Sequence, residues 1–311
     1  MKFNKYAVLA AALVSTAAMA DSGTITFAAD SSSGTYNKML GEIINVCPDI
    51  NVQVAKDVHG GAPGNLEALV NNKVNAAFMH SDVFLANSMS DPTYAKFKTL
   101  VALYPEPIHI IALRDSKTGV SGWKGMLGSK ADFNSLGDLA GYKVGAAGGG
   151  VYTARILTGQ GQGNFEVVEY ASGDALVAGL NKGEVAAAIF VGAAPLPILD
   201  KVDKSKFKLI PVGENIAGRV STVYRPVKIS GYVGLQTTPV STLAPLAVIM
   251  TRTYNTDEKK QMQAQFRACF NQHLGNLKDD ASPNWQAVED NDHGTLNNWL
   301  DLPVATGAKR K

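Results

Sequence analysis

Short apolar runs alternate with amphipathic stretches along most of this chain. The apolar runs are rich in β-branched residues, which is typical of strands. The predicted strands are 23–29, 51–56, 76–79, 100–104, 108–113, 142–147, 166–170, 185–191, 207–212 and 246–251. Helical spacing of apolar positions predicts helices that open at 33–36 and 81, and helices over 65–71, 151–158, 172–182 and 257–274. This alternation of strand and helix predicts an α/β architecture with parallel strands.

The pattern occurs twice, and a break separates the two series. Pro105 and Pro107 flank Glu106, and the two prolines impose a stiff, extended bend. Residues 69–78 and 180–190 then end alike, with Lys, Val and an Ala-Ala pair before an aromatic residue. Two related lobes explain this echo, although any two α/β units share some likeness.

The length of 311 residues exceeds what one core comfortably holds. The predicted division is 1–20 as a signal peptide, 21–110 plus 245–311 as the first lobe, and 111–244 as the second.

The first twenty residues have the three parts of an export signal. A short basic start, Met1–Tyr6, precedes the apolar run Ala7–Val14 and a small-residue site at Ala18–Ala20. The apolar run is well short of the roughly 20 residues that cross a bilayer. We therefore expect cleavage after Ala20 and a location in the periplasm.

Charge and cysteine content narrow the partners. The chain has 29 basic and 27 acidic residues, and residues 1–20 hold two lysines and no acid, so 27 of each remain after cleavage. Nucleic acid is not expected as a partner, since binding its phosphates requires clustered basic residues. Cys47 and Cys269 form a disulfide or two buried thiols, and the oxidising compartment favours the disulfide.

Two glycine-rich loops that open predicted helices are candidate ligand sites. Ser33-Gly34-Thr35 and Gly148-Gly149-Gly150 follow strands, where glycine lets a ligand approach the backbone and the helix dipole favours an anion. Such loops lie at the carboxyl ends of strands in α/β sheets, where ligands bind. Plain turns are the alternative. Ser81 and Asp82 could contact ligand or cap a helix, and Tyr104 and Glu106 could line a cleft or brace a hinge.

The usual catalytic motifs are incomplete. Gly148-Gly149-Gly150 lacks the rest of a dinucleotide fingerprint, and no P-loop occurs. Ser121 lacks the second glycine of a nucleophile elbow. The five histidines have no metal-ligand spacing and are expected to be structural or on the surface. We predict no enzyme activity, no cofactor and no metal. An exported enzyme on the same fold remains the alternative of a different class.

Four stretches carry a family resemblance: 34–36, 60–66, 81–83 and 103–109. Together they resemble the TAXI proteins, the extracytoplasmic solute-binding subunits of TRAP transporters. The resemblance implies a two-lobed periplasmic binding protein of the type II-like class, with a mixed sheet flanked by helices in each lobe. Two hinge segments, 108–113 and 238–251, would join the lobes. The subunit would be a monomer that captures a small carboxylate, such as glutamate or a dicarboxylate, and delivers it to a TRAP membrane permease.

The same resemblance supplies most of the candidate ligand contacts. With Ser33 from the first glycine-rich loop, they are Gly34, Thr35, Tyr36, Gly61, Asn65, Ser81, Asp82, Tyr104, Glu106, Gly150, Val151, Tyr152, Thr153, Phe190 and Gly192. His80 departs from the family, which often has glutamine there. Arg155 could reach a carboxylate or point to solvent. A binding subunit of an ATP-driven importer and a sensor accessory protein are alternatives on the same fold.

Overall fold

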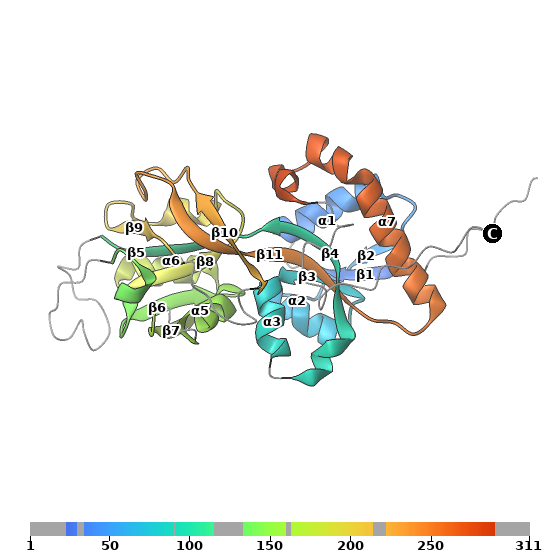
Figure 1. Cartoon of the computed structure of the whole chain (residues 1–311), viewed down its shortest axis with the longest axis horizontal. Helices are drawn as coiled ribbons and strands as arrows, with labels where there is room; N and C mark the ends of the chain where they lie inside the picture. The colour runs from blue at the N-terminus through green and yellow to red at the C-terminus, as the bar shows by residue number, and fades with distance from the viewer. Residues whose placement is uncertain are drawn as a thin grey trace, which may run out of the picture.

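A computed structural model describes residues 23–29, 34–89, 91–114, 133–159, 163–213 and 222–289. The predicted signal peptide, Ser33 and residues 290–311 lie outside these ranges. The described residues form two lobes arranged along the long axis of the molecule, each with a sheet flanked by helices (Figure 1). The predicted fold class, a two-lobed α/β protein, is confirmed.

The first lobe, lobe 1, contains both ends of the described chain. Its strands are β1 (Ile25–Ala28), β2 (Val52–Val54), β3 (Ala76–His80), β4 (Phe97–Pro105) and the second part of β11 (Val240–Arg252). Its helices are α1 (Thr35–Val46), α2 (Gly61–Val70), α3 (Ser81–Ser88) and α7 (Asp257–Asp280). The strand order is β2-β1-β3-β11-β4, with β1, β2 and β3 parallel and β11 antiparallel to its neighbours.

Lobe 2 repeats this strand order. Its strands are β5 (Ile108–Leu113), β6 (Lys143–Ala147), β7 (Glu166–Tyr170), β8 (Ala187–Val191) and β9 (Phe207–Ile210), and its helices are α5 (Gly150–Gly159) and α6 (Gly173–Lys182). The order is β7-β6-β8-β5-β9, with β6, β7 and β8 parallel and β5 antiparallel to both of its neighbours. The matching order argues that the sequence echo reflects two related lobes.

Two strand segments cross between the lobes. The first is the bend at 105–107 between β4 and β5. The second is β11, whose later part pairs with β3 and β4. The early part of β11 pairs with β10 (Tyr224–Ile229), and its Thr242 hydroxyl donates to the carbonyl of Ile108 in lobe 2 at 2.7 Å. The predicted first hinge, 108–113, is misplaced, because these residues form β5 and pair with β8 and β9 inside the lobe 2 sheet.

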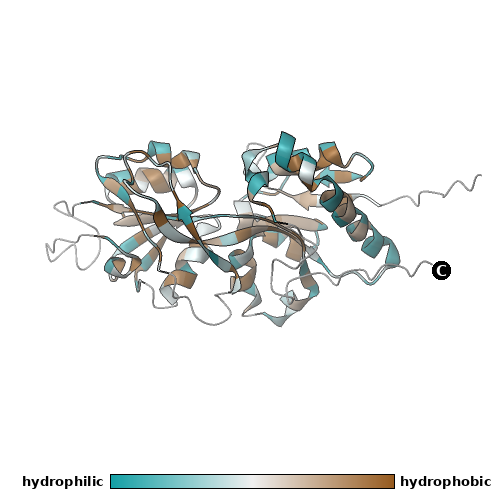
Figure 2. Ribbon diagram, turned by 45° about the horizontal axis from the view of Figure 1, so that its top comes forward, coloured by the Kyte–Doolittle hydropathy of each residue, from teal (hydrophilic) through white to brown (hydrophobic). Residues whose placement is uncertain are grey.

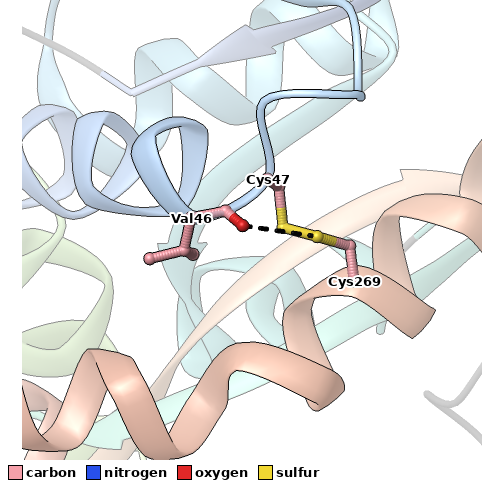
Figure 3. Close-up of a disulfide and its surroundings, with 3 residues drawn as sticks. All are labelled: Val46, Cys47 and Cys269. Carbon is pink, nitrogen blue, oxygen red and sulfur yellow. Dashed lines mark hydrogen bonds between the residues drawn. A yellow bond between two sulfur atoms is a disulfide. The ribbon is translucent and has the colours of Figure 1, made fainter.

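Two hydrophobic cores hold the lobes. One lies within lobe 1 and includes Phe27, Phe78 and Phe266, whereas the other continues from lobe 1 into lobe 2. Hydrophilic and hydrophobic residues alternate along α1 and α7, so these helices each pack one side inward (Figure 2). A disulfide joins Cys47, at the end of α1, to Cys269 of α7 (Figure 3).

Prolines account for the main errors in the predicted elements. Residues 60–64 were predicted as a loop, but α2 begins at Gly61 because Pro63 is tolerated in a first turn, where its missing N–H costs nothing. The pattern did not predict β10, which contains Pro226, or the start of β11 before Pro245. α7 also runs past the predicted end at 274 to Asp280.

None of the helices in the described ranges combines the length and hydropathy needed to cross a membrane.

Candidate functional site

A cavity of about 620 Å³ lies between the lobes. Its lining includes residues at the carboxyl ends of four parallel strands: Ala29 after β1, His80 of β3, Ala147 of β6 and Val191 of β8. In α/β sheets this edge is where ligands bind, because loops rather than regular structure follow the strands there. The fold therefore brings equivalent edges of the two sheets to one space.

Four helices begin at this cavity. Gly34 and Thr35 line it at the start of α1, Gly61 at the start of α2, Gly150 at the start of α5, and Gly173 at the start of α6. The N-cap residues of α1 and α2 are glycines, which have no side chain to accept from first-turn N–H groups. The positive ends of four helix dipoles thus face the same volume, an arrangement that favours a negatively charged group.

Glu106 forms the acidic part of the cavity lining in lobe 1. It is buried, and its Oε2 accepts from the Tyr36 hydroxyl at 2.6 Å while its Oε1 accepts from the Tyr104 hydroxyl at 3.1 Å. Burial and then the charge of Glu106 raise the pKa of both tyrosines well above the usual value. The two hydroxyls therefore remain protonated and hold the carboxylate in one orientation.

Behind the cavity, Asp82 connects lobe 1 to lobe 2. Its side chain is fully buried at the start of α3, and Oδ2 accepts from Thr153 of α5 at 2.6 Å and from Tyr224 of β10 at 2.8 Å. Burial, followed by the charge of Asp82, raises the pKa of Tyr224, so this hydroxyl also stays a donor. Asp82 thus links α3 of lobe 1 to α5 of lobe 2 by a buried hydrogen bond next to the crossing strands.

His80 lies between these two carboxylates. Its Nε2 is 3.4 Å from Oε2 of Glu106, and its Nδ1 is 3.8 Å from Oδ1 of Asp82. The ring packs against Gly149 of lobe 2, where an added Cβ would lie 2.6 Å from Cε1 of the imidazole. Only glycine at position 149 permits this approach, so the close fit of His80 and Gly149 is a second contact between the lobes.

The lobe 2 side of the cavity is largely apolar. Leu176 of α6, Phe190 of β8, and Leu196 and Ile198 after β8 all line it. The backbone N–H of Leu196 donates to the Tyr232 hydroxyl at 2.7 Å. This hydroxyl lies 2.6 Å from Nε2 of the buried His109 of β5, so a hydrogen-bonded chain ties the wall to the second sheet.

The structure separates the predicted contacts into two sets. Those that line the cavity are Gly34, Thr35, Tyr36, Gly61, Glu106, Gly150, Phe190 and Gly192. Those that lie outside its lining are Asn65, Ser81, Asp82, Tyr104, Val151, Tyr152 and Thr153. Ser33 falls outside the described residues. Among these, Tyr104 touches the cavity only through Glu106, while Asp82 and Thr153 bond to each other.

Other side chains in the second set serve the framework. Asn65 donates to the carbonyl of Phe78, and the Ser81 hydroxyl accepts from the N–H of Leu246. Tyr152 faces a separate cavity of about 440 Å³ beside α2. Arg155 is exposed and pairs with Glu169, so it points away from the site.

Sequence reasoning missed His80 and most of the apolar wall, and it identified Gly149 only as part of a glycine-rich loop. His80 ends a strand directly before Ser81 and Asp82, and that position was a usable signal. Leu196 and Ile198 follow Pro195 and Pro197 in a segment without periodicity, so nothing in the pattern marks them. Across the described ranges, no set of three His, Cys, Asp or Glu side chains is placed to hold a metal ion.

Comparison with known proteins agrees with this architecture. Residues 27–261 match the NMT1-like family. A solved structure from Bordetella bronchiseptica RB50 is 12% identical, with a TM-score of 0.51, and covers 86% of this chain and 76% of its own. At this identity the likeness concerns the fold alone.

Two further solved structures cover most of the chain at lower TM-scores. An ancestral arginine-binding protein bound to arginine is 14% identical, with a TM-score of 0.49 over 85% of this chain and 95% of its own. A putative L-cystine ABC transporter protein from Listeria monocytogenes is 18% identical, with a TM-score of 0.48 over 81% and 91%. The sequence matches no curated protein.

Proposed function

Because the chain belongs to the NMT1-like family, we propose that it is the extracytoplasmic solute-binding subunit of a TRAP transporter of the TAXI type. The observation that carries the proposal is the cavity between two lobes of equal strand order, with four helix N-termini facing it. Export through residues 1–20, and delivery to a TRAP membrane permease by a freely diffusing monomer, belong to the same proposal.

The proposed solute is a small carboxylate. Its negative charge would lie against the helix starts at Gly34, Gly61, Gly150 and Gly173, where backbone dipoles stabilise anions without a basic side chain. Glu106, held by Tyr36 and Tyr104, would orient the remaining polar groups of the solute. A volume of about 620 Å³ is within the range of small-molecule sites. The family resemblance favours glutamate or a dicarboxylate as the solute.

The proposed mechanism is closure of the lobes about the two crossing segments. Each segment is a narrow strand connection, so a small change in backbone angles near 105–107 and in the middle of β11 would rotate one lobe against the other. Solute that contacts both lobes would stabilise the closed form only through contacts made there, and would shift an existing equilibrium toward it. The pairs Asp82–Thr153 and His80–Gly149 would fix how far closure proceeds.

Native mass spectrometry of the exported protein, purified without unfolding, tests the solute class. We expect a bound mass that matches a small carboxylate. Adding this compound at a hundred times its Kd should stabilise the protein by about 2.7 kcal/mol, seen as a higher Tm, and should compact it in solution scattering. A neutral sugar as the bound species would contradict the proposal.

A further inference from the structure

We propose that the apolar wall of lobe 2 makes the cavity selective for carboxylates with an apolar tail over dicarboxylates. The wall consists of Leu176, Phe190, Leu196 and Ile198. This inference rests on the proposed function, since it concerns the part of the solute that lies beyond its carboxylate. It replaces the glutamate or dicarboxylate that the family resemblance suggests with a carboxylate that has an apolar tail.

The wall is a built surface. An added Cβ at Gly173 would lie 2.6 Å from Cδ1 of Ile198, and one at Gly192 would lie 2.9 Å from Cδ1 of Leu196. The side chains of Ile198 and Leu196 therefore pack directly against the backbone at these two glycines. In the same way, glycine at 145 makes room for Leu176, whose Cδ1 would be 2.4 Å from an added Cβ.

The position of the wall is fixed from behind. The Leu196 N–H donates to Tyr232, which contacts His109. Burial raises the pKa of Tyr232 to about 12 and lowers the pKa of His109 to about 4, so near neutral pH an uncharged hydroxyl and an uncharged imidazole share this hydrogen bond. A wall held by a buried chain of hydrogen bonds keeps its shape when solute arrives.

With the first carboxylate at the helix starts, a second carboxylate is left with the apolar wall or with Glu106. Against Leu176, Phe190, Leu196 and Ile198 it would lose its water without gaining donors, which is costly for a charged group. Against lobe 1 it would face the Glu106 carboxylate, whose like charge repels it. An apolar tail gains from the same wall, about fourfold in affinity for each buried methylene.

Four commercially available compounds test the inference by calorimetric titration of the exported protein. Leucine and glutamate differ in the side chain, as do 4-methyl-2-oxopentanoate and 2-oxoglutarate, so the comparison does not depend on an amino group. In each pair that binds, we expect the apolar member to bind at least about tenfold more tightly than its acidic partner. Tighter binding of glutamate or 2-oxoglutarate would overturn the inference and leave the proposed function standing. Binding of none of the four, with no carboxylate retained in the purified protein, would count against the proposed function itself.

A variant isolates the wall from the rest of the cavity. Leu196→Lys places a cation in the wall at a half-buried position, and we expect it to shift the preference at least tenfold toward the acidic member of each pair. Ile156→Lys changes a half-buried apolar residue of α5 that does not line the cavity, and should leave the preference unchanged. If Leu196→Lys does not fold, Ile198→Thr is the alternative, and it should reduce the affinity ratio between the apolar and the acidic member of each pair. An unchanged preference in a folded wall variant would refute the selective role of the wall.

Discussion

The two lobes share a strand order, yet they end their third parallel strand in different chemistry. β3 and β8 are each the third parallel strand of their lobe in chain order and are each five residues long, so the first residues, Ala76 and Ala187, correspond. Counting forward, His80-Ser81-Asp82 corresponds to Val191-Gly192-Ala193. Lobe 1 thus presents ionisable groups at this edge, and lobe 2 presents small and apolar ones. Topology determines where the cavity forms, and a few side chains at strand ends determine what it can hold.

A disulfide is the largest difference between the lobes in the described part of the chain. Cys47 and Cys269 are 222 residues apart, so in the chain-entropy model the bond stabilises lobe 1 by about 5 kcal/mol. We expect the double variant Cys47→Ala, Cys269→Ala to lose about that much free energy of unfolding, measured in urea. Reducing the wild type with dithiothreitol should reproduce the loss, and leave the variant unchanged. A loss below about 1 kcal/mol would mean that the unfolded lobe is already compact.

Acid should weaken lobe 2 through His109. Burial lowers its pKa from 6.5 to about 4, so the folded state resists protonation that the unfolded chain accepts. The stability that depends on neutral His109 is complete above pH 6.5 and is lost as pH falls toward 4, by about 3 kcal/mol in total. His109→Gln removes this titration, so the stability difference between variant and wild type should change over that window. A difference that stays constant from pH 7 to pH 4 would contradict the assignment.

The hydrogen bonds of Asp82 between the lobes can be compared with an exposed ion pair inside lobe 2. Asp82→Asn replaces a buried carboxylate that accepts from Thr153 and Tyr224, and charge-assisted hydrogen bonds of this kind are each stronger than neutral ones. We expect a loss of about 2 kcal/mol in the free energy of unfolding. The matched control is Asp174→Asn in lobe 2, where an exposed pair with Lys201 should contribute less than about 1 kcal/mol. Equal losses in the free energy of unfolding for the two substitutions would show that Asp82 does not stabilise the contact between the lobes.

The smallest effect should come from the contact of His80 with Gly149. Gly149→Ala adds a methyl group 2.6 Å from the imidazole, so the lobes must separate slightly and solute should bind about tenfold more weakly, equivalent to about 1.4 kcal/mol. Gly41→Ala is the control, because its Cβ meets nothing within 4 Å in helix α1. This control should stabilise the protein by roughly 0.5–1 kcal/mol and leave affinity unchanged. If Gly149→Ala binds solute with wild-type affinity, the close contact of His80 with Gly149 is not needed for binding.

The sequence located the glycine-rich parts of the site better than the rest. Gly34 and Gly150 were identified because a strand followed by glycine and a helix marks the binding edge of a sheet, and Gly61 was identified through the family resemblance. Asp82 was expected either to cap a helix or, as the family resemblance implies, to contact the ligand. In the structure, the Asp82 side chain lies between α3 and α5, where it accepts a hydrogen bond from Thr153, and it does not line the cavity. Pattern along one element cannot show which neighbouring element comes within hydrogen-bonding distance.

The strands were predictable in proportion to how regular their burial is. β3 and β8 are almost fully buried apolar runs, and both were recognised. β10 alternates, contains Pro226, and is stable only because β11 pairs with it, so its existence depends on tertiary context. The wall residues Leu196 and Ile198 are hidden for the same reason, since they acquire a common surface only when the chain folds against α6.

The route of the chain imposes an order on folding. All five strands of the lobe 2 sheet come from residues 108–210, so this sheet can pair as soon as that stretch of chain is available. Lobe 1 cannot, because β11 lies at the centre of its sheet between β3 and β4 and follows lobe 2 in the chain. Until then the β3 edge is unpaired, and exposed edges of this kind pair with other chains. Oxidation of Cys47 with Cys269 comes later still, since Cys269 lies near the middle of α7, so the disulfide forms only after the strands of both lobes have appeared in the chain.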